Sequence, residues 1–341
     1  SQLLDVAPEF PITKRIAVII NGDTDESRHT GNVDRAIAAL EAQGFDTFYI
    51  VGDTTPSESH NVFNHSLEGI NEMFTSLAGE LQKDNLVFFY GTGHGDKESS
   101  MIIGEQKYTK SNMITHFEMI KDKGARGVFV FDTCYSGSIP RAIYEAGIEG
   151  VALSPAPVGK TASCQFFAPR FFDSLREGRD SDQSGESDIF EITLDAFNFY
   201  RDKMSSKEGE IMASVPELTL SNVESIENST KPVLILQSAT WCPPCKIFKK
   251  MLASVMHSLS PYISVVVITS DKNEQSRKIK ERLGLAETKK IPAFSLRMSD
   301  GQNSDLHFGG MNFEELRQWL KQQGVNVSGN ITVGEDIKVE S

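Results

Sequence analysis

Cysteine is scarce in this chain of 341 residues, which contains only Cys134, Cys164, Cys242 and Cys245. Four cysteines are too few for a scaffold built on disulfides, so that class of small secreted protein is excluded. Hydrophobic residues make up 39% of the sequence and charged residues 24%, which is typical of an ordinary globular protein. The length is sufficient for two domains.

Long apolar runs and an excess of basic residues are also missing. No apolar run approaches the roughly 18 residues that a membrane-spanning helix needs, so we expect no membrane span. Lys and Arg total 34 against 47 Asp and Glu, which gives a formal net charge of −13. Binding to phosphate backbones needs clustered Lys and Arg, so we expect no nucleic-acid partner. The first residue is Ser1 rather than Met, which agrees with removal of an N-terminal segment such as a signal peptide.

Two short apolar runs are the first informative features that are present. Residues 86–90 and 127–131 have the length and composition of buried strands, and each ends abruptly in small residues. Residues 109–123 between them have helical spacing of apolar side chains, which predicts a strand, helix, strand unit with a right-handed crossover. Parallel strands of such a unit end at the same sheet edge, so we expect His94 and Cys134 to emerge side by side.

A cysteine beside a histidine suits nucleophilic catalysis. The imidazole of His94 can take the proton of the Cys134 thiol and later deliver it to a leaving amine. The backbone N–H groups of Gly95 and Cys134 can stabilise the oxyanion that forms on the attacked carbonyl. For either residue alone, a polar loop histidine or a buried structural cysteine is the alternative.

The Thr-Gly-His-Gly motif at 92–95 and the Asp-Thr-Cys motif at 132–134 resemble the catalytic motifs of the caspase–legumain clan of cysteine peptidases. Within the clan they look most like the legumain family, which includes the catalytic subunit of the GPI-anchor transamidase. The resemblance covers roughly residues 14–203. It implies an α/β fold with a caspase-like sheet sandwiched by helices, and a cysteine endopeptidase that uses a Cys-His dyad.

The same resemblance implies residues that select the substrate side chain before the scissile bond. Arg28, followed by His29, matches the Arg-His pair of legumain-like members, and Asp132 matches an acidic pocket position. A pocket with both charges suits Asn, whereas Asp132 alone would favour Arg or Lys and Arg28 alone would favour Asp. A solvated loop charge is the alternative for Arg28. Glu26 replaces an Asn that supports the catalytic histidine in legumain, so the third catalytic group stays open.

Residues 180–191 follow the spacing of a calcium-binding loop. Asp180, Asp182 and Ser184 would supply ligands, and Glu191 would close the loop as a bidentate ligand. A Ser at the fifth position departs from the pattern, and an acidic solvated loop is the alternative. No cofactor is required for the predicted chemistry, so calcium is the single cofactor hypothesis.

A second motif lies in the C-terminal third of the chain. Trp241 precedes the Cys-x-x-Cys pair of Cys242 and Cys245, which follows the apolar strand 232–236 and opens a helix. A helix N-terminus lowers the pKa of the first thiol of such a pair, which makes it an attacking thiolate. A metal site and a structural disulfide are the alternatives. The segment from about 216 to 324 resembles thioredoxin, with Pro292 at the place of that fold's cis-proline.

Leu236 stands six residues before Cys242, where thioredoxin has a buried carboxylate. The predicted organisation is an N-terminal extension at 1–14, a caspase- or legumain-like peptidase at 15–203, a linker at 204–215, a thioredoxin-like domain at 216–325 and a flexible tail at 326–341.

The predicted function is a cysteine endopeptidase that cleaves after Asn, coupled to a dithiol/disulfide domain. An Arg/Lys-specific peptidase of the same clan, a transamidase, and an oxidoreductase with a non-catalytic caspase-like partner-binding domain are the alternatives. Polypeptides and disulfide-bonded proteins are the expected partners. The combined motifs favour an extracytoplasmic location, periplasmic or secreted.

Overall fold

The computed structural model describes residues 12–163, 165–180, 187–204, 209–272 and 274–328. The chain forms two compact units, Ser1–Ser214 and Val215–Ser341. None of the helices in the described ranges combines the length and the apolar character that crossing a bilayer would require.

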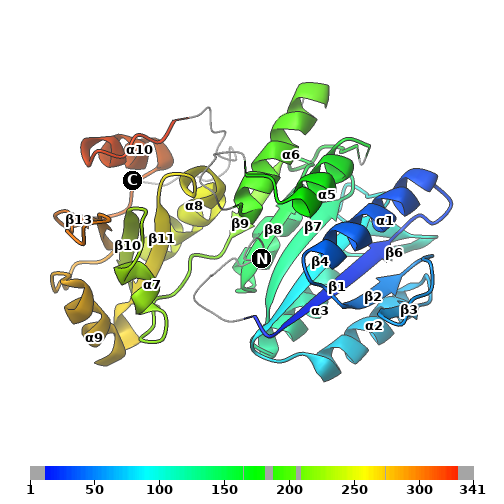
Figure 1. Cartoon of the computed structure of the whole chain (residues 1–341), viewed down its shortest axis with the longest axis horizontal. Helices are drawn as coiled ribbons and strands as arrows, with labels where there is room; N and C mark the ends of the chain where they lie inside the picture. Colours follow the sequence, from blue (N-terminus) through cyan, green and yellow to red (C-terminus); the bar gives the residue numbers. More distant parts are fainter. Residues whose placement is uncertain (1–11, 164, 181–186, 205–208, 273, 329–341) are drawn as a thin grey trace. The chain divides into compact units, whose positions relative to one another are not determined.

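The first unit is built on a seven-stranded sheet with the order β3-β2-β1-β4-β7-β8-β9 (Figure 1). Its strands are β1 (Lys14–Asn21), β2 (Thr47–Val51), β3 (His60–Phe63), β4 (Asn85–Thr92), β7 (Arg126–Asp132), β8 (Gly150–Ser154) and β9 (Glu210–Ala213). Neighbouring strands are parallel except for β9, which runs antiparallel to β8. A short antiparallel pair, β5 (Met101–Ile103) with β6 (Gln106–Tyr108), lies outside this sheet.

Helices pack on both faces of the seven-stranded sheet (Figure 1). One group is α1 (Ser27–Ala42), α5 (Phe167–Glu177) and α6 (Ile189–Met204); the other is α2 (Leu67–Glu80), α3 (Lys110–Asp122) and α4 (Ile139–Glu145), which follows the 3₁₀ turn η1 (Ser136–Ser138). Strand residues alternate between the faces, as the period of two requires: Phe89 packs against Phe117 of α3, and Tyr90 packs against Phe172 of α5. Fully buried β4 residues therefore contribute to two hydrophobic layers.

The predicted strand, helix, strand unit around residues 86–131 is present as β4, α3 and β7. Thr109 begins α3 with a capping box, in which its hydroxyl accepts from the N–H of Asn112 while Asn112 accepts from the N–H of Thr109. The mixed α/β class expected from the sequence is confirmed.

The segment 204–215 is not a plain linker. Residues Glu210–Ala213 form β9, whose Ile211, Met212 and Ala213 are buried and paired with β8. The polar residues around this strand conceal it in the sequence, because four residues are too few to show a period. Beyond it, Glu217 pairs with Val267 in an isolated parallel bridge.

The second unit contains a four-stranded sheet with the order β11-β10-β12-β13 (Figure 1). The strands are β10 (Val233–Ser238), β11 (Ser264–Thr269), β12 (Ala293–Arg297) and β13 (His307–Phe308); the helices are α7 (Val223–Glu227), α8 (Pro243–Leu259), α9 (Glu274–Leu283) and α10 (Phe313–Gln322), with the 3₁₀ turn η2 (Ser270–Lys272). Strand β10 is parallel to β11 and antiparallel to β12. A layer of buried apolar residues joins α7 and α9 to β10 and β11, while Phe294 of β12 packs against Phe248 of α8 and Trp319 of α10.

The predicted terminal segments are partly structured. Thr13 donates its backbone N–H to the carbonyl of Asp84, and Lys14 begins β1, so the extension is shorter than 1–14. At the other end, Val327 is buried and Tyr262 donates its hydroxyl to the carbonyl of Ser328. Residues 1–11 and 329–341 lie outside the described residues.

Candidate functional site

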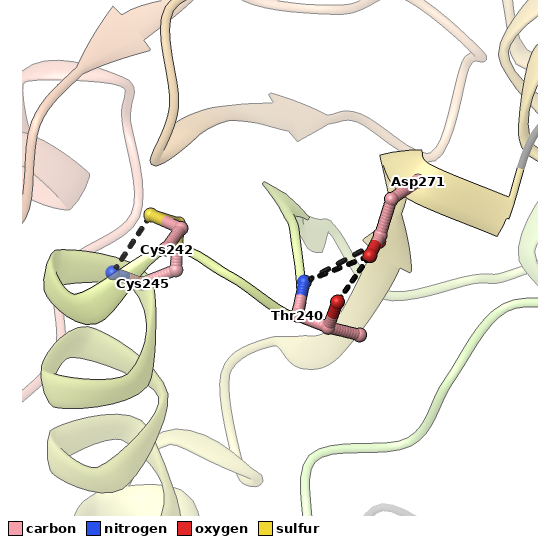
Figure 2. Close-up of a disulfide and its surroundings, with 4 residues drawn as sticks. All are labelled: Thr240, Cys242, Cys245 and Asp271. Atoms are coloured by element: carbon pink, nitrogen blue, oxygen red, sulfur yellow. Dashed lines mark hydrogen bonds between the residues drawn. A yellow bond between two sulfur atoms is a disulfide. The ribbon is translucent and has the colours of Figure 1, made fainter.

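The Cys-x-x-Cys segment lies where β10 passes into α8. Cys242 is the N-cap of α8, and its sulfur accepts the backbone N–H of Cys245 at 3.2 Å (Figure 2). Pro243 occupies the first helical turn, where its missing N–H costs no hydrogen bond. The sequence therefore places the first sulfur at the positive end of the helix dipole, where a thiolate is stabilised.

Cys242 and Cys245 form a disulfide, with their Cα atoms 5.3 Å apart. Both cysteines are buried, whereas the neighbouring Trp241 is 69% exposed. A large exposed aromatic ring beside a buried disulfide offers an apolar contact surface to an incoming polypeptide. Because the two sulfurs are bonded to each other, neither acts as a metal ligand in this state.

The loop between β10 and the disulfide is hydrogen-bonded to the 3₁₀ turn η2, which follows β11. Asp271 of η2 accepts the hydroxyl and the backbone N–H of Thr240, the latter at 3.3 Å (Figure 2). On the other side, Ile291 packs against the small buried cluster that contains both cysteines, and the Ile291–Pro292 peptide bond is cis. Leu236 is fully buried in β10, so an apolar side chain occupies the position, six residues before Cys242, at which thioredoxin has a buried carboxylate.

The second candidate site lies at the carboxyl edge of the seven-stranded sheet. The last residues of three adjacent strands are in register: Asn21 of β1 pairs with Thr92 of β4, which pairs with Asp132 of β7. The loops that carry His94 and Cys134 therefore leave neighbouring strand ends, as the strand, helix, strand topology predicts. A Cβ atom added at Gly95 would lie 2.1 Å from the carbonyl oxygen of Cys134, so the two loops touch through their backbones.

This contact makes Gly95→Ala a destabilising substitution. The added methyl group meets backbone atoms of Cys134 rather than the end of a flexible side chain, so the loops must separate. We expect a loss of about 1–3 kcal/mol in the free energy of unfolding, measured by urea denaturation. Gly31→Ala is the matched control, because Gly31 lies in α1 with no atom near its added Cβ. That control should stabilise the protein by about 0.5–1 kcal/mol, and equal effects of the two changes would contradict the packing argument.

The chain turns sharply after Cys134. Tyr135 has a left-handed backbone conformation with φ 59°, and its N–H donates to the carbonyl of Lys160 at 2.8 Å. The hydroxyl of Ser136 donates to the carbonyl of Thr133 at 2.7 Å, which closes the turn. Cys134 is half-buried, and its thiol donates to the carbonyl of Ala162 at 3.4 Å.

The imidazole of His94 faces two carboxylates. Its Nε2 atom lies 3.1 Å from Glu26 Oε1 and 3.1 Å from Asp23 Oδ2. Partial burial opposes ionisation of Glu26, but hydrogen bonds from Arg28 and His94 outweigh it and hold the pKa of this carboxyl below its ordinary value. Glu26 thus contacts the histidine from the position that the sequence comparison had left open.

Arg28 and Asp132, the predicted specificity residues, have different surroundings. Arg28 is exposed, and its Nε forms an ion pair with Glu26. Asp132 is 1% exposed, and the hydroxyl of Tyr90 donates to its Oδ2 at 3.3 Å. Burial raises the pKa of Asp132 to about 7, although the Tyr90 hydrogen bond and the charge of Arg28 favour the ionised form. An acid that is half protonated near neutral pH is a weak selector of Arg or Lys.

The predicted calcium loop is only partly within the described residues. Asp182 and Ser184 lie outside them, as does Cys164. Asp188 accepts the N–H groups of Phe190 and Glu191 at the start of α6, and the Glu191 carboxylate accepts the N–H of Asp188 at 3.0 Å. The carboxylate of Glu191 therefore has a capping role in its own helix. Calcium binding by Asp180 and Glu191 stays a prediction.

Two site residues were missed at the sequence level. Asp23 and His29 join Glu26 and His94 in one group, in which each residue offers one ligand atom within 4.8 Å of the others. Asp23, Glu26 and His29 are three residues apart along the loop and first turn of α1. That spacing would have indicated a shared face, but only with knowledge of where α1 begins.

The second unit is similar to known thioredoxins. A family profile described as thioredoxin matches residues 214–322. Thioredoxin C-3 of Corynebacterium nephridii is 33% identical over 106 residues, which are 31% of this chain and 67% of that protein. The chloroplastic thioredoxin Y1 of Arabidopsis thaliana is 34% identical over 95 residues, which are 28% of this chain and 51% of that protein. The chain thus spans about half the length of this second relative.

Among solved structures, oxidised mitochondrial thioredoxin 3 from Saccharomyces cerevisiae is similar at 25% identity, with a TM-score of 0.26. That match covers 32% of this chain and 95% of the yeast chain. The thioredoxin resemblance expected from the motif around Trp241 is confirmed by the family profile and by the curated relatives. The chain therefore belongs to the thioredoxin family through residues 214–322, the segment that carries the Cys242–Cys245 disulfide.

Proposed function

We propose that this protein is a thiol–disulfide oxidoreductase that acts through Cys242 and Cys245. The observation that carries the proposal is the disulfide at the N-terminus of α8, beside the exposed Trp241. Helix-terminal N–H groups stabilise a thiolate on the first cysteine more than a thiol, which lowers its pKa and favours attack.

The exchange needs only the two cysteines and a substrate disulfide. In the reduced protein, the Cys242 thiolate attacks one sulfur of the substrate disulfide and releases the other as a thiolate. The Cys245 thiol then loses its proton and attacks Cys242, which forms the intramolecular disulfide and releases the second substrate thiolate. The substrate gains two electrons, and the dithiol loses them. Leu236 offers no carboxylate to take the Cys245 proton, so the proton passes to solvent.

Reduction of a fluorogenic disulfide-linked peptide, with dithiothreitol as the electron source, tests this proposal. Wild-type protein should accelerate the reaction, and Cys242→Ser should reduce the rate to that of dithiothreitol alone. Cys134→Ala is the matched control and should retain the full rate. A Cys242→Ser protein as active as the wild type would remove the proposal.

A second candidate activity is a cysteine peptidase at Cys134. The specific observation in its favour is the backbone contact between Gly95 and Cys134, which sets the His94 and Cys134 loops side by side. With Asp23 and Glu26 at Nε2 of His94, the Nδ1 atom is the ring nitrogen that would take the thiol proton. The Cys134 sulfur would then attack a peptide carbonyl, and the N–H groups of Gly95 and Cys134 would stabilise the oxyanion.

Peptides that differ only in Asn, Asp, Arg or Lys before the scissile bond test the peptidase. Turnover after Asn, lost in Cys134→Ala, would support a mixed-charge pocket with Arg28 and Asp132. Turnover only after Arg or Lys would assign the pocket to Asp132 alone. Product masses with an added amine would separate hydrolysis from transamidation. No turnover with reductant and calcium present would remove the peptidase proposal and leave a partner-binding role for the first unit.

If both activities are present, the dithiol has two uses for the peptidase. It would keep the Cys134 thiol reduced, or it would open disulfide-bonded proteins before cleavage. Replacement of both Cys242 and Cys245 by Ser should then lower peptide or protein cleavage under mild oxidation. Unchanged cleavage of both peptide and disulfide-bonded protein substrates would exclude the two uses.

A further inference from the structure

The group formed by Asp23, Glu26, His29 and His94 takes no part in the proposed disulfide exchange, and it shares Asp23, Glu26 and His94 with the second candidate activity. The loop after β1 supplies Asp23, the first turn of α1 begins at Glu26 and supplies His29, and the loop after β4 supplies His94. We propose that these four side chains form a binding site for a divalent transition-metal cation of the zinc class. The site uses no cysteine and depends on neither proposed activity.

His29 provides the observation that points to a ligand. Its side chain is 98% buried, because only 2% of its surface is accessible. Its Nδ1 atom lies 2.8 Å from the hydroxyl oxygen of Thr92, yet its buried Nε2 atom has no hydrogen-bond partner among the described residues. A buried polar atom without a partner is costly, so native structures rarely contain one without a reason. A cation bound to Nε2 supplies that reason.

In three of these side chains, a hydrogen bond or an ion pair already occupies one polar atom, which leaves the other polar atom directed toward the cluster. Backbone N–H groups at 3.0 and 3.2 Å donate to Asp23 Oδ1, which leaves Oδ2 toward His94. Arg28 pairs with Glu26 Oε2, which leaves Oε1 toward His94. When His29 Nδ1 donates to Thr92, its Nε2 presents a lone pair. Outer partners of this kind orient metal ligands and fix the histidine tautomer.

The spacing of the ligand atoms fits a small cation. Two of the distances are 3.1 Å, from His94 Nε2 to Asp23 Oδ2 and to Glu26 Oε1, and the four ligand atoms all lie within 4.8 Å of one another. Zinc bonds of about 2.1 Å to nitrogen and oxygen imply a tetrahedron edge of roughly 3.4 Å. The two short distances lie slightly below that value, so one cation can bind all four atoms after local adjustment of the side chains.

The charges favour occupation by a dication. Nε2 of His94 carries at most one proton, yet two carboxylate oxygens lie 3.1 Å from it. One proton cannot satisfy both oxygens with good geometry, and Arg28 offsets only one of the two negative charges. A divalent cation would neutralise the remainder and bind all four ligand atoms.

The mixture of ligands selects the class of metal. Calcium and magnesium prefer oxygen ligands alone, whereas imidazole nitrogen suits zinc and other late first-row metals. Two imidazoles with two carboxylates therefore favour zinc over the hard cations.

The test is zinc binding to the full chain that carries Cys242→Ser and Cys245→Ser, because a reduced dithiol would itself bind zinc. Competition with a chromophoric chelator gives the stoichiometry and the affinity. We expect one zinc ion per chain and an affinity at least about tenfold lower in His29→Gln, Asp23→Asn and Glu26→Gln. Asp23→Asn and Glu26→Gln keep an oxygen for the existing hydrogen bonds, so they remain informative if His29→Gln fails to fold.

His60→Gln is the matched control, because His60 lies on β3 away from the cluster, and it should not change the affinity. Cys134→Ala should also leave the affinity unchanged, and the cobalt-substituted protein should show no thiolate charge-transfer band. Loss of zinc in Cys134→Ala would assign the metal to the thiol and overturn the proposal. So would unchanged affinity in Asp23→Asn and Glu26→Gln, calcium binding as tight as zinc binding, or no zinc binding at all.

Discussion

A Cys245→Ser variant should accumulate as a covalent mixed disulfide with its substrate proteins, to a level near one adduct per chain. Cys242 caps α8 and its sulfur accepts the Cys245 N–H, so we expect Cys242 to be the attacking cysteine. Cys245 lies inside the helix, fully buried, and can reach only Cys242. Without the Cys245 thiol, the intermediate between Cys242 and the substrate cannot resolve by intramolecular attack.

The adducts are measured on non-reducing gels, and mass spectrometry identifies the proteins released by reductant. Cys134→Ala and Cys164→Ala should both be present in every variant, because these other thiols would form adducts of their own. Cys242→Ser is the matched control and should trap nothing. Equal amounts of trapped substrate in Cys242→Ser and Cys245→Ser would contradict the assignment of Cys242 as the attacking cysteine.

How much of this site could be predicted depends on how local its determinants are. The dithiol, the helix that follows it and Pro292 are encoded by short motifs, so the sequence pointed to the same segment, residues 214–322, that the family profile matches. Strands β4 and β7 were predictable because buried parallel strands are continuous apolar runs. Strand β9 was hidden, because its pairing with β8 depends on residues about 60 positions away.

The environment of His94 shows the limit more sharply. Its position at the sheet edge follows from topology, but its neighbours Asp23 and His29 depend on how the loop after β1 folds back toward it. The surroundings of Asp132 could not be predicted from the sequence either. The sequence predicts Asp132 as a charge that faces a pocket, whereas in the structure its side chain is buried and accepts a hydrogen bond from Tyr90. Side-chain burial at a strand end is set by the loops above it, and these have no periodic signal.

Replacement of Asp132 by Asn should remove a large pH dependence from the stability of the first unit. Burial raises the pKa of Asp132 from 3.8 to about 7, so the folded state retains a proton that the unfolded chain releases at lower pH. The stability from this proton is fully present below about pH 4, is lost as the pH rises toward 7, and changes no further above that. A shift of about three units corresponds to roughly 4 kcal/mol.

The measured quantity is the difference in free energy of unfolding between Asp132→Asn and wild type, at pH 4 and at pH 8. It should increase by up to about 4 kcal/mol in favour of the variant. The amide group left without an acceptor costs stability equally at both pH values, so it cancels. Far-UV circular dichroism follows both units, and tryptophan fluorescence isolates the second, because Trp241 and Trp319 both lie there. Asp122→Asn, at an exposed site on α3, is the control, and its stability relative to wild type should be the same at pH 4 and at pH 8. If the free energies of unfolding of wild type and Asp132→Asn change with pH in parallel, the buried carboxyl holds no proton.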